Sequence, residues 1–213
     1  MFAVNTYQHV EEIERSFEDR HIVILLFVRP SLPDASNIIN EFDYIHYNSE
    51  RYCSIYAVGY SNGFEKASDP EYRFAGKAAG LDWYYSNKSF VEFKNKLEYR
   101  LKWRYSGEIE LLVLQNNPGG HTPLNFQNYV AIDVNRGIKE GYVDSFYRLM
   151  ESLIRYSKNE VTATEAFGKA YNSRIKLRTL IEDVLEDCKQ IPTPIKKILK
   201  DRLFYKACIY KGA

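Results

Sequence analysis

The residues best placed for chemistry follow two apolar segments in the first third of the chain. Residues 21–28 read H-I-V-I-L-L-F-V and lead into R-P-S-L-P-D, while residues 53–60 read C-S-I-Y-A-V-G-Y and lead into S-N-G. In an open α/β sheet, ligands bind beyond the carboxyl ends of the parallel strands. Polar side chains from both segments are therefore expected to converge at one edge, as a candidate ligand-binding set of Arg29, Ser31, Asp34, Tyr60 and Asn62.

This candidate set has two interpretations. A helix that begins near Asp34 would add backbone N–H donors, so that the set could hold the anionic group of a nucleotide or of another phosphate-bearing ligand. Ser31 and Asp34 also have the S-x-x-D spacing of a capping pair, in which both side chains bond backbone N–H groups at the start of a helix. We favour the capping interpretation, and the phosphate interpretation stays open.

Two other patterns each have a functional and a structural interpretation. Asp43 and His46, three apart on a predicted helix, could share a metal or act as an acid/base pair, but no second His or Cys pair has ligand spacing. Lys96, Arg100 and Arg104 form a basic stripe beside aromatic residues, as in nucleic-acid-binding proteins. Glutamates four residues ahead of lysines in this segment predict an ion-paired, solvated face instead.

Two further segments carry polar residues with a weaker signal. Residues 118–121, P-G-G-H, lack the Gly-x-x-x-x-Gly-Lys pattern of a phosphate-binding loop and predict a flexible turn. Asp133 ends a predicted strand directly before N-R-G, where it could be a ligand carboxylate or an acid at the start of a helix. We favour the helix start.

Composition excludes several classes of protein. Of the 213 residues, 45% are hydrophobic and 27% charged, which is typical of a folded globular chain, and the net charge of +1 gives no general attraction to nucleic acids or membranes. The N-terminus lacks the features of a signal peptide and no apolar run reaches the roughly 18 residues of a membrane span, so we expect a cytoplasmic protein. The three cysteines predict neither disulfides nor a zinc site, and we expect no metal and no cofactor; they are Cys53, Cys188 and Cys208.

Hydrophobic periodicity and capping signals divide the chain into an α/β part, residues 1–157, and a C-terminal helical extension, residues 158–213. The helix expected over 7–18 should bury Val10, Ile13 and Phe17, which recur at helical spacing. Residues 61–88 form a long connection in which 82–85 could be a short element. The extension begins with a capping box at 162–165, and seven basic residues stand against one acidic residue in 189–213. The other predicted elements are strands 2–4, 21–28, 53–60, 108–114 and 129–134, and helices 34–50, 89–105 (with a capping box at 89–92) and 137–157.

The order of these elements resembles the thioredoxin-like superfamily, in which a βαβ half is joined through a helix to a ββα half. Residues 27–34, F-V-R-P-S-L-P-D, stand in the place of that family's strand end and Cys-Gly-Pro-Cys motif, with Ser31 and Asp34 at the two cysteine positions. The resemblance implies a thioredoxin-like central sheet without the redox pair, because the family's chemistry needs a thiolate activated by a helix N-terminus. Ser106 and Gly107 stand where the family has a cis-proline. Residues 42–47 and 103–108 look similar to segments of uncharacterised bacterial proteins.

The missing thiols and the 18 tyrosines, a residue type favoured at partner surfaces, together predict a redox-inactive thioredoxin-like protein that binds another protein in a bacterial cytosolic assembly. A second copy of the chain is a further candidate partner, whereas nucleic acid and membranes are not expected. The alternative is an enzyme or effector that acts on a nucleotide or other phosphate-bearing ligand at the candidate set, in bacterial anti-phage defence.

Overall fold

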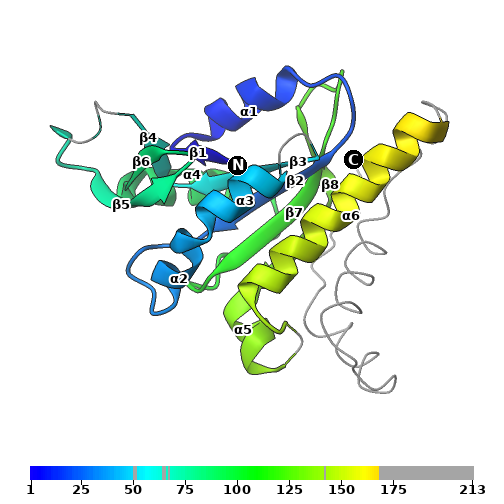
Figure 1. Ribbon diagram of the computed structural model, residues 1–213. Helices are drawn as coiled ribbons and strands as arrows, with labels where there is room; N and C mark the ends of the chain where they lie inside the picture. Colours follow the sequence, from blue (N-terminus) through cyan, green and yellow to red (C-terminus); the bar gives the residue numbers. More distant parts are fainter. Residues whose placement is uncertain (50–51, 64–65, 67, 142, 168–213) are drawn as a thin grey trace.

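The computed structural model describes residues 1–49, 52–63, 66, 68–141 and 143–167. Its central layer is a five-stranded sheet of β1 (Phe2–Val4), β2 (Ile22–Phe27), β3 (Cys53–Val58), β7 (Glu110–Asn116) and β8 (Leu124–Asp133), in the order β1-β3-β2-β7-β8 (Figure 1). The first three strands are parallel to one another, whereas β7 runs antiparallel to β2 and β8 antiparallel to β7. The expected α/β class is thus confirmed as a mixed sheet with helices.

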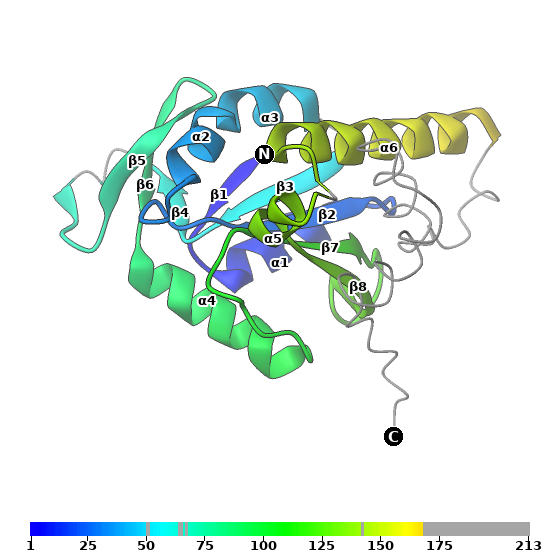
Figure 2. The same ribbon diagram turned by 90° about the horizontal axis from the view of Figure 1, so that it is seen from below.

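Helices cover both faces of this sheet, and this coverage explains the continuous apolar sequence of its middle strands. One face lies under α2 (Ala35–Asn40), α3 (Phe42–Ser49) and α6 (Phe146–Phe167), and the other under α1 (Tyr7–Arg15) and α4 (Asn87–Arg100) (Figure 2). Every residue of β2 and β3 is buried, as expected for strands covered on both sides. The parallel pairing of β2 with β3 confirms the predicted βαβ unit.

A second, three-stranded antiparallel sheet lies within the stretch that the sequence leaves as a connection. It contains β4 (Tyr60–Asn62), β5 (Arg73–Ala78) and β6 (Leu81–Tyr85), in the order β4-β6-β5. The chain passes from β3 into β4 through Gly59, which has a φ of +85° and where a Cβ would lie 2.7 Å from the Cβ of Phe90. Both features require glycine. Only the short element suggested at 82–85 anticipates this sheet.

Several element boundaries differ from the predictions. The helix expected over 34–50 is two helices, α2 and α3, separated at Glu41. The N-cap of α4 is Ser86, whose Oγ accepts a hydrogen bond from the N–H of Ser89 at 3.2 Å, so the predicted capping box at 89–92 does not begin the helix. β8 begins at Leu124, five residues before the predicted strand.

The helix expected over 137–157 is also two helices, α5 (Val134–Lys139) and α6. Asp133 is the N-cap of α5, and its Oδ1 accepts a hydrogen bond from the N–H of Arg136 at 2.9 Å, which confirms the helix-start interpretation. α6 continues past residue 157 to Phe167, so the predicted capping box at 162–165 lies inside a helix and begins none. The rest of the extension, including Cys188, Cys208 and the basic segment 189–213, lies outside the described residues.

Candidate functional site

Arg29 joins two loops at the carboxyl end of β2. It lies two residues beyond the end of that strand, and its Nη2 donates a hydrogen bond to the carbonyl oxygen of Gly107 at 2.9 Å. Its guanidinium carbon lies 5.7 Å from the centroid of the Tyr105 ring, within the range of a cation–π contact. The loop after β2 is therefore tied to the loop that precedes β7.

The loop before β7 is itself fixed by a buried carboxylate. Glu110 Oε2 accepts a hydrogen bond from Trp103 Nε1 at 3.1 Å, and its Oε1 accepts one from the N–H of Ser106 at 3.1 Å. Burial raises the pKa of Glu110, while the bonds from Ser106 and Trp103 act in the opposite direction. These contacts place Tyr105 and Gly107 where Arg29 meets them.

Tyr60 supports the end of β2 from the second sheet. Its side chain is completely buried, and its hydroxyl donates a hydrogen bond to the carbonyl oxygen of Val28 at 3.0 Å. Burial raises the pKa of Tyr60 well above its usual value, so the phenol is neutral near pH 7. The hydroxyl of this predicted site residue is therefore already bonded within the protein.

The other three members of the candidate set lie on the surface. Ser31, Asp34 and Asn62 are exposed, and among the described residues no hydrogen bond or ion pair joins them to Arg29 or Tyr60. Asp34 is the N-cap of α2, but its carboxylate accepts no hydrogen bond from the helix, so the predicted capping pair is wrong. The chain enters α2 through two backbone turns, with N–H groups of residues 32 and 35 bonded to the carbonyl oxygens of residues 29 and 32.

The structure adds two tyrosines to Arg29 that the sequence did not single out. Tyr85, on β6, is only 9% exposed, and its hydroxyl has no hydrogen-bond partner among the described residues; Nε of Arg29 has none either, and the hydroxyl of Tyr105 faces the guanidinium of Arg29, which cannot accept its proton. Burial raises the pKa of both tyrosines, and the positive charge of Arg29 acts against that rise in both. We call Arg29, Tyr85 and Tyr105 the arginine cluster.

Aromatic packing holds the arginine cluster in place. The ring of Phe90 lies 6.0 Å from that of Tyr85 and 5.4 Å from that of Tyr105, and the rings of Tyr60 and Tyr85 lie 5.2 Å apart. Tyr60 is also the cross-strand neighbour of Tyr85 in the β4–β6 pair. The W-Y-Y run at 83–85 was the only signal in the sequence for the contribution of Tyr85.

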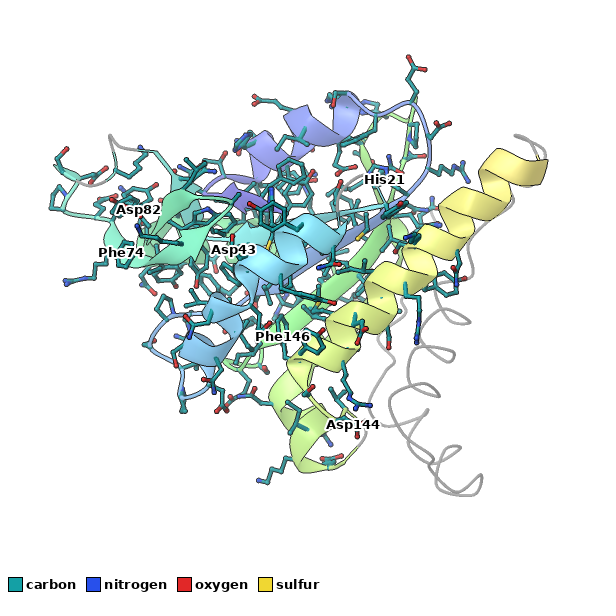
Figure 3. The ribbon with its side chains drawn as sticks, in the orientation of Figure 1. His21, Asp43, Phe74, Asp82, Asp144 and Phe146 are labelled. Carbon is teal, nitrogen blue, oxygen red and sulfur yellow. The ribbon has the colours of Figure 1, made fainter. Side chains whose placement is uncertain are left out.

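A second group of buried polar residues lies at the opposite end of β2, around His21 (Figure 3). His21 Nε2 lies 2.9 Å from Ser54 Oγ and 3.0 Å from Glu14 Oε2, and the hydroxyl of Tyr56 donates a hydrogen bond to Glu14 Oε1 at 2.6 Å. A Ser-His-acid triad needs the serine and the acid on different ring nitrogens, whereas both approach Nε2 here. Ser54 is also only 2% exposed. We call these four residues the histidine network, and their arrangement is structural.

Cys53 offers no reactive thiol. It begins β3, is buried and is not in a disulfide. Burial raises the pKa of its thiol to about 12, so the nucleophilic thiolate does not form near neutral pH. Cys53 thus acts as a small buried hydrophobic residue of the central sheet.

The remaining sequence patterns also have structural roles. Asp43 Oδ1 accepts a hydrogen bond from the N–H of Ala79 at 2.6 Å, in the turn of the second sheet beside which it lies (Figure 3), whereas His46 Nδ1 lies 3.1 Å from the carbonyl oxygen of Met1. The two side chains thus bond different parts of the backbone, and neither contacts the other as the predicted metal site or acid/base pair would require. In the basic stripe, Arg100 donates a hydrogen bond to the hydroxyl of Tyr7 at 3.0 Å and pairs with a carboxylate of α1 at 3.4 Å.

Compared with known protein families, curated proteins and solved structures, the chain gives no match. Within the described ranges, no helix has the length and apolar character needed to cross a membrane. The same part of the chain contains no group of three or more His, Cys, Asp and Glu side chains placed to hold a metal ion.

Proposed function

We propose that the protein is a redox-inactive, thioredoxin-like protein that acts by binding another protein at the carboxyl end of β2. The arrangement of the central sheet supports this proposal. A parallel βαβ half, β2 to β3, is followed by α4 and then by the antiparallel pair β7 and β8 and the helix α6. This is the order of the βαβ and ββα halves in the family that the sequence resembles.

The observation that carries the proposal is the state of the two positions that correspond to the family's cysteines. Ser31 and Asp34 are exposed, neither is a thiol, and Asp34 makes no capping bond. Cys53 lies at the other end of the sheet with a thiol that stays protonated. The loop of residues 30–34 thus presents the polar side chains of Ser31 and Asp34 next to the anchored Arg29, which suits recognition better than electron transfer.

Site-specific photo-crosslinking tests the proposed binding surface. A photoreactive phenylalanine analogue at Ser31 of the full chain, in extracts of cells that naturally express the protein, should form a discrete adduct that excess unlabelled protein suppresses. Tyr99, on α4 and 94% exposed, is the matched control position. The same adducts from both positions, or none at Ser31, would contradict the proposal. An adduct with the protein itself would identify a second copy as the partner.

The alternative function, an enzyme or effector that acts on a nucleotide or other phosphate-bearing ligand, is favoured by one observation. The arginine cluster combines a guanidinium that makes no ion pair with the described residues and two hydroxyls without acceptors. A role in a bacterial cytosolic assembly or in anti-phage defence stays a prediction from the sequence.

A further inference from the structure

We propose that Arg29, Tyr85 and Tyr105 form a binding site for a small oxyanion, the phosphate or carboxylate group of a ligand. The site deepens the alternative function and does not depend on the proposed protein partner. Arg29 is the one residue of the predicted set that belongs to this site. Two tyrosines, one from the second sheet and one from the loop before β7, take the place of the exposed Ser31, Asp34 and Asn62.

The charge of Arg29 is not neutralised by the described residues around it. Its one hydrogen bond is to the neutral carbonyl group of Gly107. The carboxylates of the adjoining loop have other partners: Glu110 accepts from Trp103 and Ser106, and Glu108 Oε2 accepts from Asn135 Nδ2 at 2.9 Å. A partly buried guanidinium in this state is best stabilised by an anion that accepts its remaining N–H groups.

The two tyrosines supply further donors at the same place. Their hydroxyls are buried and neither proton has an acceptor among the described residues, a state that costs about 1–3 kcal/mol for each unsatisfied buried polar group. Tyr60, in the same aromatic group, differs because its hydroxyl is bonded to Val28. Since burial raises the pKa of Tyr85 and Tyr105 despite the nearby guanidinium, both keep their protons near neutral pH and remain donors.

The position of the arginine cluster fits a ligand site. It lies at the carboxyl ends of β2 and β3, the edge at which open α/β sheets bind ligands. Arg29 and Tyr105 are each partly exposed, so the cluster lies near the surface, whereas Tyr85, Nε of Arg29 and both hydroxyls are buried. An oxyanion here would accept charge-assisted bonds from the guanidinium and from both hydroxyls.

Calorimetric titration of the full chain with inorganic phosphate and, separately, with acetate tests the proposal at matched ionic strength, with chloride as the reference. Saturable binding of either anion is expected, and the stronger of the two identifies the ligand class. Tyr85→Phe and Tyr105→Phe should each weaken that binding roughly tenfold or more, because each removes one donor to an anion and keeps the ring. Arg29→Gln should abolish it.

Tyr56→Phe is the matched control, since its buried hydroxyl is bonded to Glu14 at the other end of β2 and its loss should leave the anion affinity unchanged. Tyr85→Phe and Tyr105→Phe should also unfold no more easily than the parent protein without anion, so weak binding cannot be attributed to misfolding. If Arg29→Gln does not fold, the two Phe variants still decide the question. Binding no stronger than that of chloride, undiminished binding by both Phe variants at positions 85 and 105, or equal weakening by Tyr56→Phe would each overturn the proposal.

Discussion

The two ends of β2 bury polar groups in opposite ways. At its start, the histidine network of Glu14, His21, Ser54 and Tyr56 places each functional group within 3.0 Å of another, and one atom, Glu14 Oε2, has only the close approach to His21 Nε2 and no hydrogen bond within the described part of the chain. At its end, the arginine cluster leaves Arg29 Nε and two tyrosine hydroxyls without partners among the described residues. Buried polar groups in folded proteins are nearly always bonded. The first end therefore satisfies most of its own polar groups, whereas the second has the character of a site that an external group completes.

The two ends of β2 also differ in the elements that supply their polar residues. The histidine network joins α1, the residue just before β2, and β3, so its members come from elements that pack together in any case. The arginine cluster draws on the second sheet and on a loop of irregular backbone. Binding residues are commonly held on such segments by a rigid scaffold, which agrees with the proposed roles of the two ends.

The largest expected effect comes from breaking the histidine network. Glu14→Ala should lower the free energy of unfolding by about 3 kcal/mol, because it leaves the buried hydroxyl of Tyr56 without its acceptor and removes the carboxylate beside His21. Urea unfolding measures this loss. Glu12→Ala, at an exposed position of the same helix, is the control and should change stability by no more than about 0.5 kcal/mol. Equal losses in both variants would show that the histidine network does not stabilise the fold.

The buried position of Glu14 also shows where sequence patterns fail. Periodicity predicts that the first helix buries Val10, Ile13 and Phe17. Val10 is buried and Ile13 packs partly buried against the core, but Phe17 lies beyond the end of α1 and is 36% exposed, and the other buried residues of α1 are Tyr7 and Glu14. Both sets have helical spacing. The pattern treats glutamate as solvent-facing, and only its partners, His21 just before β2 and Tyr56 on β3, make the burial of Glu14 favourable. Those partners are distant in sequence, so the helix and part of its buried face could be predicted, and the burial of Glu14 could not.

The same reasoning applies to the fold and the site. β1, β2 and β3 were predicted closely because their apolar runs are continuous, and Arg29 was found because it follows one of them. The second sheet was missed because β5 is largely exposed and lacks an apolar face. Tyr85 reaches Arg29 only through that sheet, and Tyr105 only through the contacts of Glu110, so neither could be assigned from local sequence.

A smaller effect is expected at Glu110, the bonded carboxylate beside the arginine cluster. Burial raises its pKa in the folded protein, so the folded state holds this proton more tightly than the unfolded state. Stability from this group is therefore present in acid and decreases as pH rises from the usual carboxyl range through the raised pKa. Urea unfolding should be measured for the parent protein and for Glu110→Gln between pH 4 and 7. The free energy of unfolding of the parent should exceed that of the variant most at low pH, and this difference should shrink as the pH rises. Parallel curves would mean that Glu110 is not perturbed by burial.

The smallest expected effect tests whether the loop after β2 is free for a partner. Asp34 is the N-cap of α2 without a capping bond, whereas Thr6 Oγ1 accepts a hydrogen bond from the N–H of His9 at 3.2 Å at the start of α1. Thr6→Ala should therefore cost about 1 kcal/mol of unfolding free energy, and Asp34→Ala and Ser31→Ala less than about 0.5 kcal/mol each.

Thermal and urea unfolding of the three variants decide between two roles for this loop. If Asp34→Ala costs as much as Thr6→Ala, the carboxylate stabilises the helix and is not available to a partner, and the proposed binding surface loses its support. If the loss is small, the polar side chains of residues 31 and 34 contribute little to the fold that carries them. The loop is anchored by Arg29, so side chains in it that add almost nothing to stability are then available to bind a partner.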